Sequence, residues 1–367
     1  MTDDRATDDR ATDGLAAALD RAAVVVCCGS GGVGKTTTAA VLGLQLAEQG
    51  RRVVVVTIDP AKRLADALGL AGGLTNDPTQ LEIDATGELW ATMLDTAATF
   101  DGLVRTNAPS EEQAERILSN RFYRNIAGAL SGTQEYMAAE RLYALHGDPR
   151  FDVVIVDTPP SRHALDFLEA PGTLARFLDH PLFKLLMMPT RRGLKVLNVA
   201  AQPVLRTIGK VVGGDVLADA IAFFQAFDGM ETGFRDRADA VMTLLRSDAT
   251  RYVLVAAPKR DTIDEARYFA ARLAESSLAV SALIVNRSTP QFATPTTRRS
   301  RATTALWANH DELAATAAAE RAQLGDLVTD VAPAPVAWVP MLSSDVHDLT
   351  GLRQIRELLF GPATTTG

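Results

Sequence analysis

The sequence predicts an α/β fold in which a mostly parallel sheet is flanked by helices. Short apolar runs rich in valine recur along the chain and are separated by helical-looking stretches, which is the pattern of parallel strands buried on both faces. Polar loops follow several of these runs, and functional loops in such sheets lie at the carboxyl ends of the strands. The strands are expected at residues 23–28, 53–59, 153–157, 252–257, 283–286 and 336–339.

A glycine-rich loop follows the first of these runs. Residues 28–37 read CGSGGVGKTT and contain the pattern G-x-x-x-x-G-K-T. Between a strand and a helix, this pattern predicts a phosphate-binding loop (P-loop), in which backbone N–H groups turn inward around phosphates beside the positive end of the helix dipole. The alternative is a glycine-rich turn without a ligand. The residues expected to bind the nucleotide here are Gly29, Ser30, Gly31, Gly32, Val33, Gly34, Lys35, Thr36 and Thr37.

Two P-loop side chains and two strand-end carboxylates carry the expected chemistry. Lys35 would place a charge on the outer phosphates, and the Thr36 hydroxyl would ligate Mg²⁺. Asp157 follows four apolar residues, as in a Walker B element, and would also hold Mg²⁺; the alternative is a carboxylate that caps the next turn. Asp59 precedes Pro60 and would orient the attacking water or bind the metal, or else start an Asp-Pro turn.

A third strand end is polar. Asn286 offers a donor and an acceptor suited to an adenine edge, although an Asx turn would use the same groups. We therefore expect a P-loop NTPase fold with catalytic residues Lys35 and Asp59, and with metal ligands Thr36, Asp59 and Asp157.

Composition limits the function classes. The chain has 367 residues and a net charge of -8, which argues against bulk binding of nucleic acid. The two cysteines, Cys27 and Cys28, are adjacent and form neither a disulfide framework nor a zinc clip. No apolar run approaches the roughly 20 residues of a membrane span. We expect a cytoplasmic protein, with peripheral membrane association left open.

The sequence predicts a single P-loop domain over residues 21–360 with helical inserts at about 96–147 and 164–248. Residues 1–20, in which residues 2–11 repeat the pentad TDDRA, are expected to be a disordered acidic tail, and residues 361–367 are also expected to be disordered. In the second insert, no acidic residue lies between Asp179 and Asp215, although several Lys and Arg residues do. This basic, apolar segment predicts contact with a hydrophobic client or an anionic membrane face; the alternative is a solvated face over packed helices.

Taken together, these motifs resemble the ArsA family of ATPases over nearly the whole chain from about residue 22 to 360. The resemblance rests on the P-loop, on Asp59-Pro60-Ala61, on residues 157–163, on Asn286 and on Val339-Pro340-Met341-Leu342, in that order along the chain. Residues 132–137, GTQEYM, are similar to an actinobacterial ArsA-like subgroup of anion-transporting ATPases. The family includes the arsenical pump-driving ATPase and the guided-entry ATPase that delivers tail-anchored membrane proteins.

The resemblance implies an ATP-hydrolysing dimer that uses ATP and Mg²⁺. It implies that Asp59 positions the water, that Asp157 begins the second switch segment, and that Asn286, Pro340 and Met341 hold the adenine. The helical inserts are implied to face a client or partner. The family's metalloid-binding cysteines and its zinc C-x-x-C have no counterpart in this chain.

One departure concerns Ser30, which stands where the family's P-loop carries a lysine that reaches the other subunit's phosphates. This predicts a heteromer with a related, lysine-bearing subunit in place of a homodimer. The alternatives left open are a weakly hydrolysing nucleotide-binding subunit of such a complex and a positioning ATPase of the ParA or MinD type, which is more compact.

Overall fold

The structure, a computed structural model, describes residues 13–59, 61, 63–126, 133–159, 166–179, 219, 222–223, 226, 229–292 and 299–362. The chain divides into two compact units. The first unit comprises residues 1–93, 145–165 and 246–367, and the second comprises residues 94–144 and 166–245.

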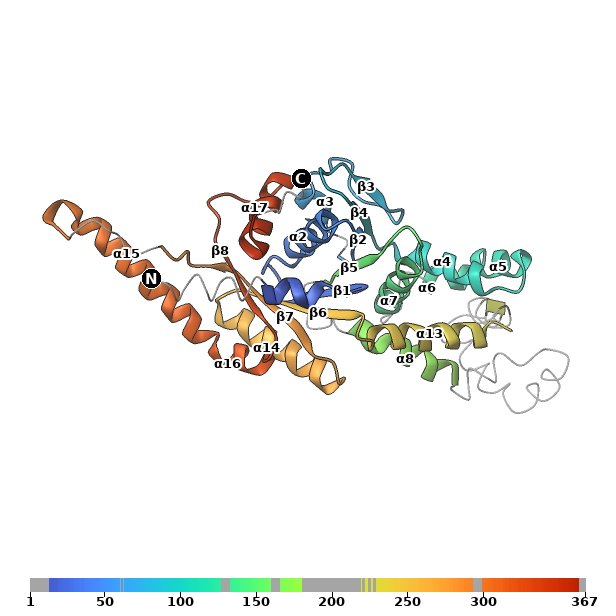
Figure 1. Cartoon of the computed structure of the whole chain (residues 1–367). Coiled ribbons are helices and arrows are strands. Elements are labelled where there is room, and N and C mark those ends of the chain that lie inside the picture. Colours follow the sequence, from blue (N-terminus) through green and yellow to red (C-terminus); the bar gives the residue numbers. More distant parts are fainter. Residues whose placement is uncertain are drawn as a thin grey trace. The chain divides into compact units, whose positions relative to one another are not determined.

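The first unit is built on a sheet of eight described strands, ordered β3-β4-β2-β5-β1-β6-β7-β8 (Figure 1). Neighbouring strands are parallel except for β3 and β4, so the predicted mostly parallel α/β sheet is confirmed. The strands are β1 (Val24–Gly29), β2 (Arg52–Thr57), β3 (Thr79–Leu81), β4 (Glu88–Met93), β5 (Val153–Asp157), β6 (Thr250–Ala256), β7 (Val280–Ser288) and β8 (Val336–Pro340).

Helices cover both faces of this sheet. Helices α2 (Lys35–Glu48) and α17 (Leu349–Phe360) lie on one face, and α14 (Arg260–Glu275) and α16 (Gly325–Val331) lie on the other (Figure 1). Because side chains alternate along a strand, Val25 and Cys27 join the core under α2. The first unit also contains α3 (Arg63–Ala67), the 3₁₀ helix Arg301–Thr303 and α15 (Thr304–Gln323).

The expected strands recur with small shifts at their ends, and β3 and β4 are additional. Strand β4 reads ELWATM, and its polar residues interrupt the apolar pattern that marks the other strands. Leu89 and Ala91 of β4 are nevertheless buried, because pairing with β2 places them in the core under α2. The sequence therefore did not predict these two strands, because β3 is short and β4 has a mixed composition.

The expectation of a disordered tail over residues 1–20 is wrong for its last part. Residues 13–19 are helical, and Leu15 and Leu19 are fully buried in the core. Leucines four positions apart share one face of a helix, and burying that face supplies the stabilisation that the polar pentads cannot. Residues 1–12 and 363–367 lie outside the described residues.

The described part of the second unit is helical. It contains α4 (Thr96–Asn107), α5 (Glu111–Leu118), α6 (Arg121–Ile126), α7 (Thr133–His146), α8 (Asp166–Asp179) and α13 (Glu231–Leu245), with α8 packed against α13. Tyr123 stacks between the rings of Phe100 and Phe223, at centroid distances of 5.3 and 6.0 Å. The basic segment expected to contact a client, residues 180–215, lies outside the described residues, so that expectation stays a prediction.

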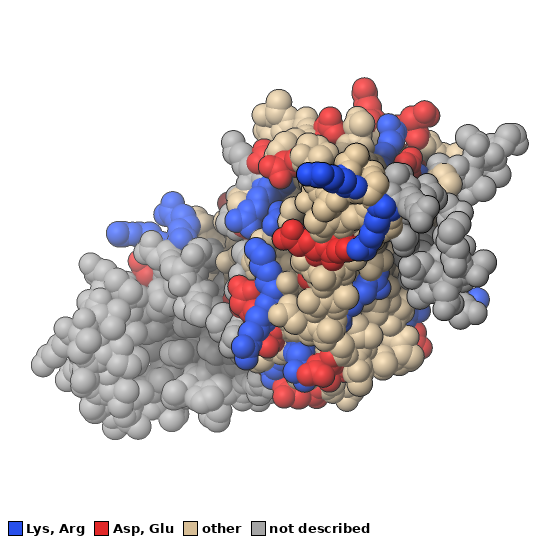
Figure 2. Space-filling model, turned by 90° about the vertical axis from the view of Figure 1, so that its left-hand side faces the viewer, with Lys and Arg blue, Asp and Glu red and all other residues tan. Residues whose placement is uncertain are grey.

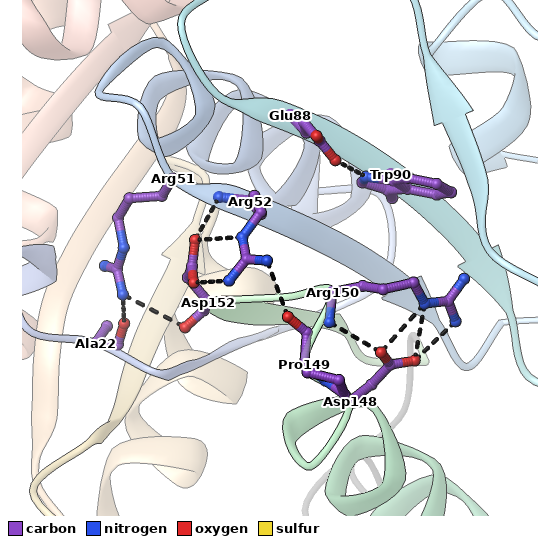
Figure 3. Close-up of polar contacts among 9 residues, drawn as sticks. All are labelled: Ala22, Arg51, Arg52, Glu88, Trp90, Asp148, Pro149, Arg150 and Asp152. Atoms are coloured by element: carbon purple, nitrogen blue, oxygen red, sulfur yellow. Dashed lines mark hydrogen bonds and ion pairs between the residues drawn. The ribbon is translucent and has the colours of Figure 1, made fainter.

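At the amino ends of the strands, arginines close the sheet (Figure 3). Arg52 at the start of β2 forms a two-pronged ion pair with Asp152, which precedes β5, and its Nη2 lies 2.6 Å from Asp152 Oδ1. Arg51 donates to the carbonyl oxygen of Ala22 at 2.7 Å, and Arg150 pairs with Asp148. These contacts tie the segments before β1, β2 and β5 to one another. The hydrogen bonds from Arg52 lower the pKa of Asp152 to about 2.

We predict a small, pH-dependent effect for Asp152→Asn. The carboxylate is exposed enough that its ion pair should contribute no more than about 1 kcal/mol to the free energy of unfolding. Because the pKa of Asp152 is lowered in the folded state, this contribution is complete above the usual carboxyl pKa and is lost as the pH falls toward 2. Urea titrations of both proteins at pH 7 and pH 3 test this. A difference in stability that grows as the pH falls would contradict it.

Candidate functional site

The P-loop lies between β1 and α2, and two of its glycines are required by its backbone. Gly29 ends β1 with φ 148°, and a Cβ there would lie 2.1 Å from the carbonyl oxygen of Val255 on β6. Gly34 caps the N-terminus of α2 with φ 93°, and a Cβ there would lie 2.2 Å from Asn286 Nδ2. Both positions combine a backbone conformation that side chains disfavour with a close neighbour, so only glycine is accommodated.

Lys35 lies inside this loop. Its side chain is 5% exposed, and its Nζ donates to the carbonyl oxygen of Ser30 at 2.7 Å. Burial lowers the pKa of Lys35, and the charge of Asp157 opposes that shift. Ser30 is also buried, and its Oγ has no hydrogen-bond partner among the described residues. Of the other P-loop residues, Gly31 and Gly32 are exposed and Thr37 is partly buried.

Asp157, at the end of β5, is the centre of a hydroxyl network. Its Oδ2 accepts from Thr36 Oγ1 at 2.8 Å and from Thr57 Oγ1, at the end of β2, at 2.9 Å. Burial raises the pKa of Asp157 to about 6, while these two hydrogen bonds and the charge of Lys35 act in the opposite direction. The hydroxyl of the next residue, Thr158, donates to the carbonyl oxygen of Cys27 at 2.7 Å and ties β5 to β1.

The donor set around Asp157 fits a magnesium ion. Asp157 Oδ1 is buried and has no hydrogen-bond partner among the described residues, which is costly unless a ligand uses it. The Thr36 hydroxyl lies beside the same carboxylate. Mg²⁺ prefers oxygen ligands and is commonly held by one or two protein groups together with phosphates. Thr36 and Asp157 are therefore brought together as the sequence predicts.

Asp59 lies close to this network but has partners of its own. Its Oδ1 accepts from the backbone N–H of Ala61 at 3.0 Å, and its Oδ2 lies 3.3 Å from Arg63 Nη1. Its backbone N–H donates to Thr57 Oγ1 at 3.3 Å, so Thr57 joins Asp59 to Asp157. The side chain of Asp59 remains 14% exposed. Pro60, which follows Asp59, lies outside the described residues.

Asn286, Pro340 and Met341 come together at the carboxyl ends of β7 and β8. Asn286 Nδ2 donates to the carbonyl oxygen of Val33 at 2.8 Å, and its Oδ1 accepts from the N–H of Arg287 at 2.9 Å. One amide hydrogen and one lone pair of Asn286 remain for another ligand. Pro340 ends β8, and the N–H of Met341 donates to the carbonyl oxygen of Ser288 at 2.8 Å. Met341 is 61% exposed.

Sequence reasoning missed three residues of this site: Thr57, Arg63 and Arg287. Arg63 had a signal, because it lies only four residues after Asp59 and carries the opposite charge. Thr57 ends an apolar strand, but only the pairing of β2 with β5 places it beside Asp157. Arg287 had no signal, because its neighbour in the P-loop is 255 residues away.

The two cysteines are buried beside the site and are poor nucleophiles. Burial raises the pKa of Cys27 well above its usual value and that of Cys28 to about 12. Within the described residues, no group of three His, Cys, Asp or Glu side chains is placed to hold a metal ion. Burial therefore disfavours the thiolate form of both cysteines.

One face of the molecule does not concentrate charge of one sign in its described part. On the face drawn in Figure 2, acidic and basic side chains are interleaved. Between α14 and α16, Arg267 pairs with Asp330 at 2.7 Å, so the charge of this arginine is neutralised locally. A nucleic-acid backbone favours a continuous basic stripe, which that face lacks in its described part. Of the helices described, none is both long enough and apolar enough to cross a bilayer.

Comparison with known proteins gives a consistent result. The family model described as "Anion-transporting ATPase" matches residues 22–361. The chain is 26% identical to the ATPase get3 of Aspergillus terreus over 271 residues, which cover 71% of each protein. It is 30% identical to the ATPase GET3 of Malassezia globosa over 154 residues, covering 42% of this chain and 44% of that protein. It is 27% identical to the arsenical pump-driving ATPase of Acidiphilium multivorum over 269 residues, covering 72% of this chain and 39% of that protein.

We predict that Gly29→Ala destabilises the protein by about 2 kcal/mol or more, because the added Cβ meets a strand carbonyl and the backbone angle is strained. Gly72→Ala is the matched control, since nothing lies within 4 Å of a Cβ there and its φ is ordinary. Gly72→Ala should change the free energy of unfolding by less than about 0.5 kcal/mol. Equal effects of the two substitutions in chemical denaturation would show that the close approach of β1 to β6 is not a constraint.

Proposed function

This chain belongs to the anion-transporting ATPase family, and we propose from that membership that it hydrolyses ATP with Mg²⁺ to switch the conformation of a dimer. The chain is an ATPase of the ArsA and GET3 type. The proposed coupling is to a membrane-protein client or to an anion-transport partner. The observation that carries the proposal is the hydrogen bond of 2.8 Å between Thr36 and Asp157 beside the buried Lys35.

In this proposal each P-loop group has one task. Backbone N–H groups of residues 29–37 bind the phosphates, and Lys35 neutralises negative charge on the outer ones. Thr36 and Asp157 hold Mg²⁺, which when bound neutralises the charge that develops on the phosphate oxygens. Burial of Asp157 favours this, because a desolvated carboxylate gains more from a nearby cation than an exposed one does.

The remaining groups position the attacking water and the adenine ring. Asp59 orients the attacking water, and its hydrogen bond from Ala61 and its ion pair with Arg63 hold the carboxylate in a defined direction. Asn286, Pro340 and Met341 hold the adenine at the ends of β7 and β8. The free N–H and lone pair of Asn286 match an adenine edge, and the exposed Met341 offers an adaptable apolar surface.

Ser30 supports a second candidate, a weakly hydrolysing subunit of a heteromeric complex. Ser30 is buried and uncharged, so it adds no positive charge to the phosphates of a neighbouring subunit. In the heteromer that we propose, a related subunit with a lysine at this position serves the nucleotide bound here. The assembly would then be asymmetric, with one faster site.

The location and partners follow from the same proposal. We expect a cytoplasmic protein that contacts a hydrophobic client or a membrane surface through residues 180–215, which lie outside the described residues. The interleaved charges on the face drawn in Figure 2 favour such a partner over nucleic acid. A positioning ATPase of the ParA or MinD type remains a weaker alternative. Co-purification would identify the client.

We predict that Lys35→Ala abolishes turnover, because it removes several kcal/mol of charge stabilisation in the transition state, or on the order of 10³-fold or more in kcat. Asp59→Asn should spare nucleotide binding and remove most of the turnover, since the amide is a poor base. Phosphate release and binding of a fluorescent ATP analogue separate the two effects. Hydrolysis by Asp59→Asn at the wild-type rate would refute the role given to Asp59.

We predict that the chain alone binds ATP but turns it over slowly, and that a lysine-bearing partner accelerates it. Trans-acting cations contribute roughly 10³-fold or more in other phosphoryl-transfer systems. Turnover and assembly mass should be measured for the chain alone, for the chain with the partner, and for Ser30→Lys. Brisk hydrolysis by a homodimer that Ser30→Lys does not change would show that the missing lysine is irrelevant.

A further inference from the structure

Two successive residues at the end of β7 hold two successive carbonyl groups of the P-loop. Asn286 Nδ2 donates to the carbonyl oxygen of Val33 at 2.8 Å, and Arg287 Nη1 donates to the carbonyl oxygen of Gly32 at 2.9 Å. Asn286 is itself fixed, because its Oδ1 accepts from the N–H of Arg287. Side chains of a strand that is distant in the sequence therefore hold the P-loop through hydrogen bonds to its backbone.

These two hydrogen bonds set the direction of two backbone N–H groups. In a trans peptide the C=O and the following N–H point in opposite directions. Holding the carbonyl of Gly32 therefore directs the N–H of Val33 away from Arg287, and holding the carbonyl of Val33 does the same for the N–H of Gly34. Among the described residues, no acceptor takes either N–H. Both remain available for an anion in the loop.

Arg287 makes this contact from a disfavoured backbone conformation. Its φ is 59°, in the left-handed region, and it lies where the register between β7 and β8 shifts. Long side chains avoid this region, and glycine or asparagine would be easier to accommodate. Strain of this kind persists where the surrounding structure imposes it, and it concentrates at functional sites. A bulge also redirects the side chain that it carries.

We propose that Arg287 is a positioning residue that pre-organises the P-loop for the phosphates of a nucleotide. It acts through the carbonyl of Gly32, and its effect appears as nucleotide affinity. The proposal rests on the ATPase function given above, because it assumes that the ligand of the loop is a nucleotide. It adds to the site a residue whose part is to orient the N–H groups and not to touch the reacting atoms.

The structure offers a matched control for the test. Ser277, after α14, is an exposed residue with the same φ of 59°, and it is the other non-glycine residue with positive φ among those described. Ser277→Gly and Arg287→Gly therefore relieve the same backbone strain at two places. Arg287→Asn keeps a Cβ and tolerates the left-handed region, but its side chain is too short to replace the guanidinium. Arg287→Lys keeps the charge and a single donor group.

The experiment measures the thermal midpoint without nucleotide and the Kd for ADP and for a non-hydrolysable ATP analogue, both with Mg²⁺. Both glycine variants should keep or raise the thermal midpoint. Arg287→Gly and Arg287→Asn should weaken binding about tenfold, the effect of one charge-assisted hydrogen bond. The loss should be equal for the two nucleotides, because P-loop N–H groups cradle the phosphates that they share. Ser277→Gly should bind as the wild type does, and Arg287→Lys should fall between.

Amide hydrogen exchange at saturating ADP and Mg²⁺ gives an independent readout, since the N–H groups of Val33 and Gly34 should be protected less in Arg287→Gly than in the wild type, and as in the wild type in Ser277→Gly. Wild-type affinity in Arg287→Gly and Arg287→Asn would overturn the proposal. So would a loss confined to the ATP analogue, which would indicate direct contact of the guanidinium with the last phosphate. Binding without turnover by the wild type would overturn the proposed hydrolysis and leave this inference standing, because its readout is affinity.

Discussion

The site depends on one buried carboxylate. Asp157 is 1% exposed, yet it is held at the end of a central strand by hydroxyls from α2 and β2. Burying a carboxylate is unfavourable unless hydrogen bonds and nearby charge compensate, and here two hydroxyls and Lys35 do so only in part. Asp157 Oδ1 has no hydrogen-bond partner among the described residues, so its desolvation is not compensated. A cation bound at Oδ1 would compensate that desolvation. The buried carboxylate therefore destabilises the free protein and favours cation binding.

Charged residues are in different environments at the two ends of the strands. At the amino ends, Arg52 and Asp152 are paired and largely exposed, so water screens them and they contribute little beyond joining the strands (Figure 3). At the carboxyl ends, Lys35 and Asp157 are buried, and their interaction is screened far less. A charged ligand would therefore interact strongly with the buried charges at the carboxyl ends of the strands and only weakly with the exposed charges at the amino ends.

Backbone conformation, more than side-chain chemistry, sets the shape of the P-loop. Gly29 and Gly34 take conformations and approaches that exclude a Cβ, and Arg287 takes a left-handed conformation at the end of β7. Both glycines lie against a neighbouring strand: Val255 of β6 faces Gly29, and Asn286 of β7 faces Gly34. The loop is thus shaped by the order β1-β6-β7 of the sheet and not by its own sequence alone.

The sequence by itself determined the strand–loop–helix unit and the mostly parallel sheet, because continuous valine-rich strands and the glycine pattern of the P-loop are local signals. It also indicated Thr36, Asp59, Asp157 and Asn286, since each is a P-loop or strand-end residue. It did not reveal β3 and β4, because their mixed composition lacks a clear apolar pattern and their burial depends on the pairing of β4 with β2 and of β3 with β4. The helix over residues 13–19 was missed because two leucines within a polar tail matter only once a core exists to receive them. Only the tertiary structure placed Thr57 and Arg287 at the site, because pairing between strands distant in the sequence decides which side chains meet at the carboxyl ends of the strands.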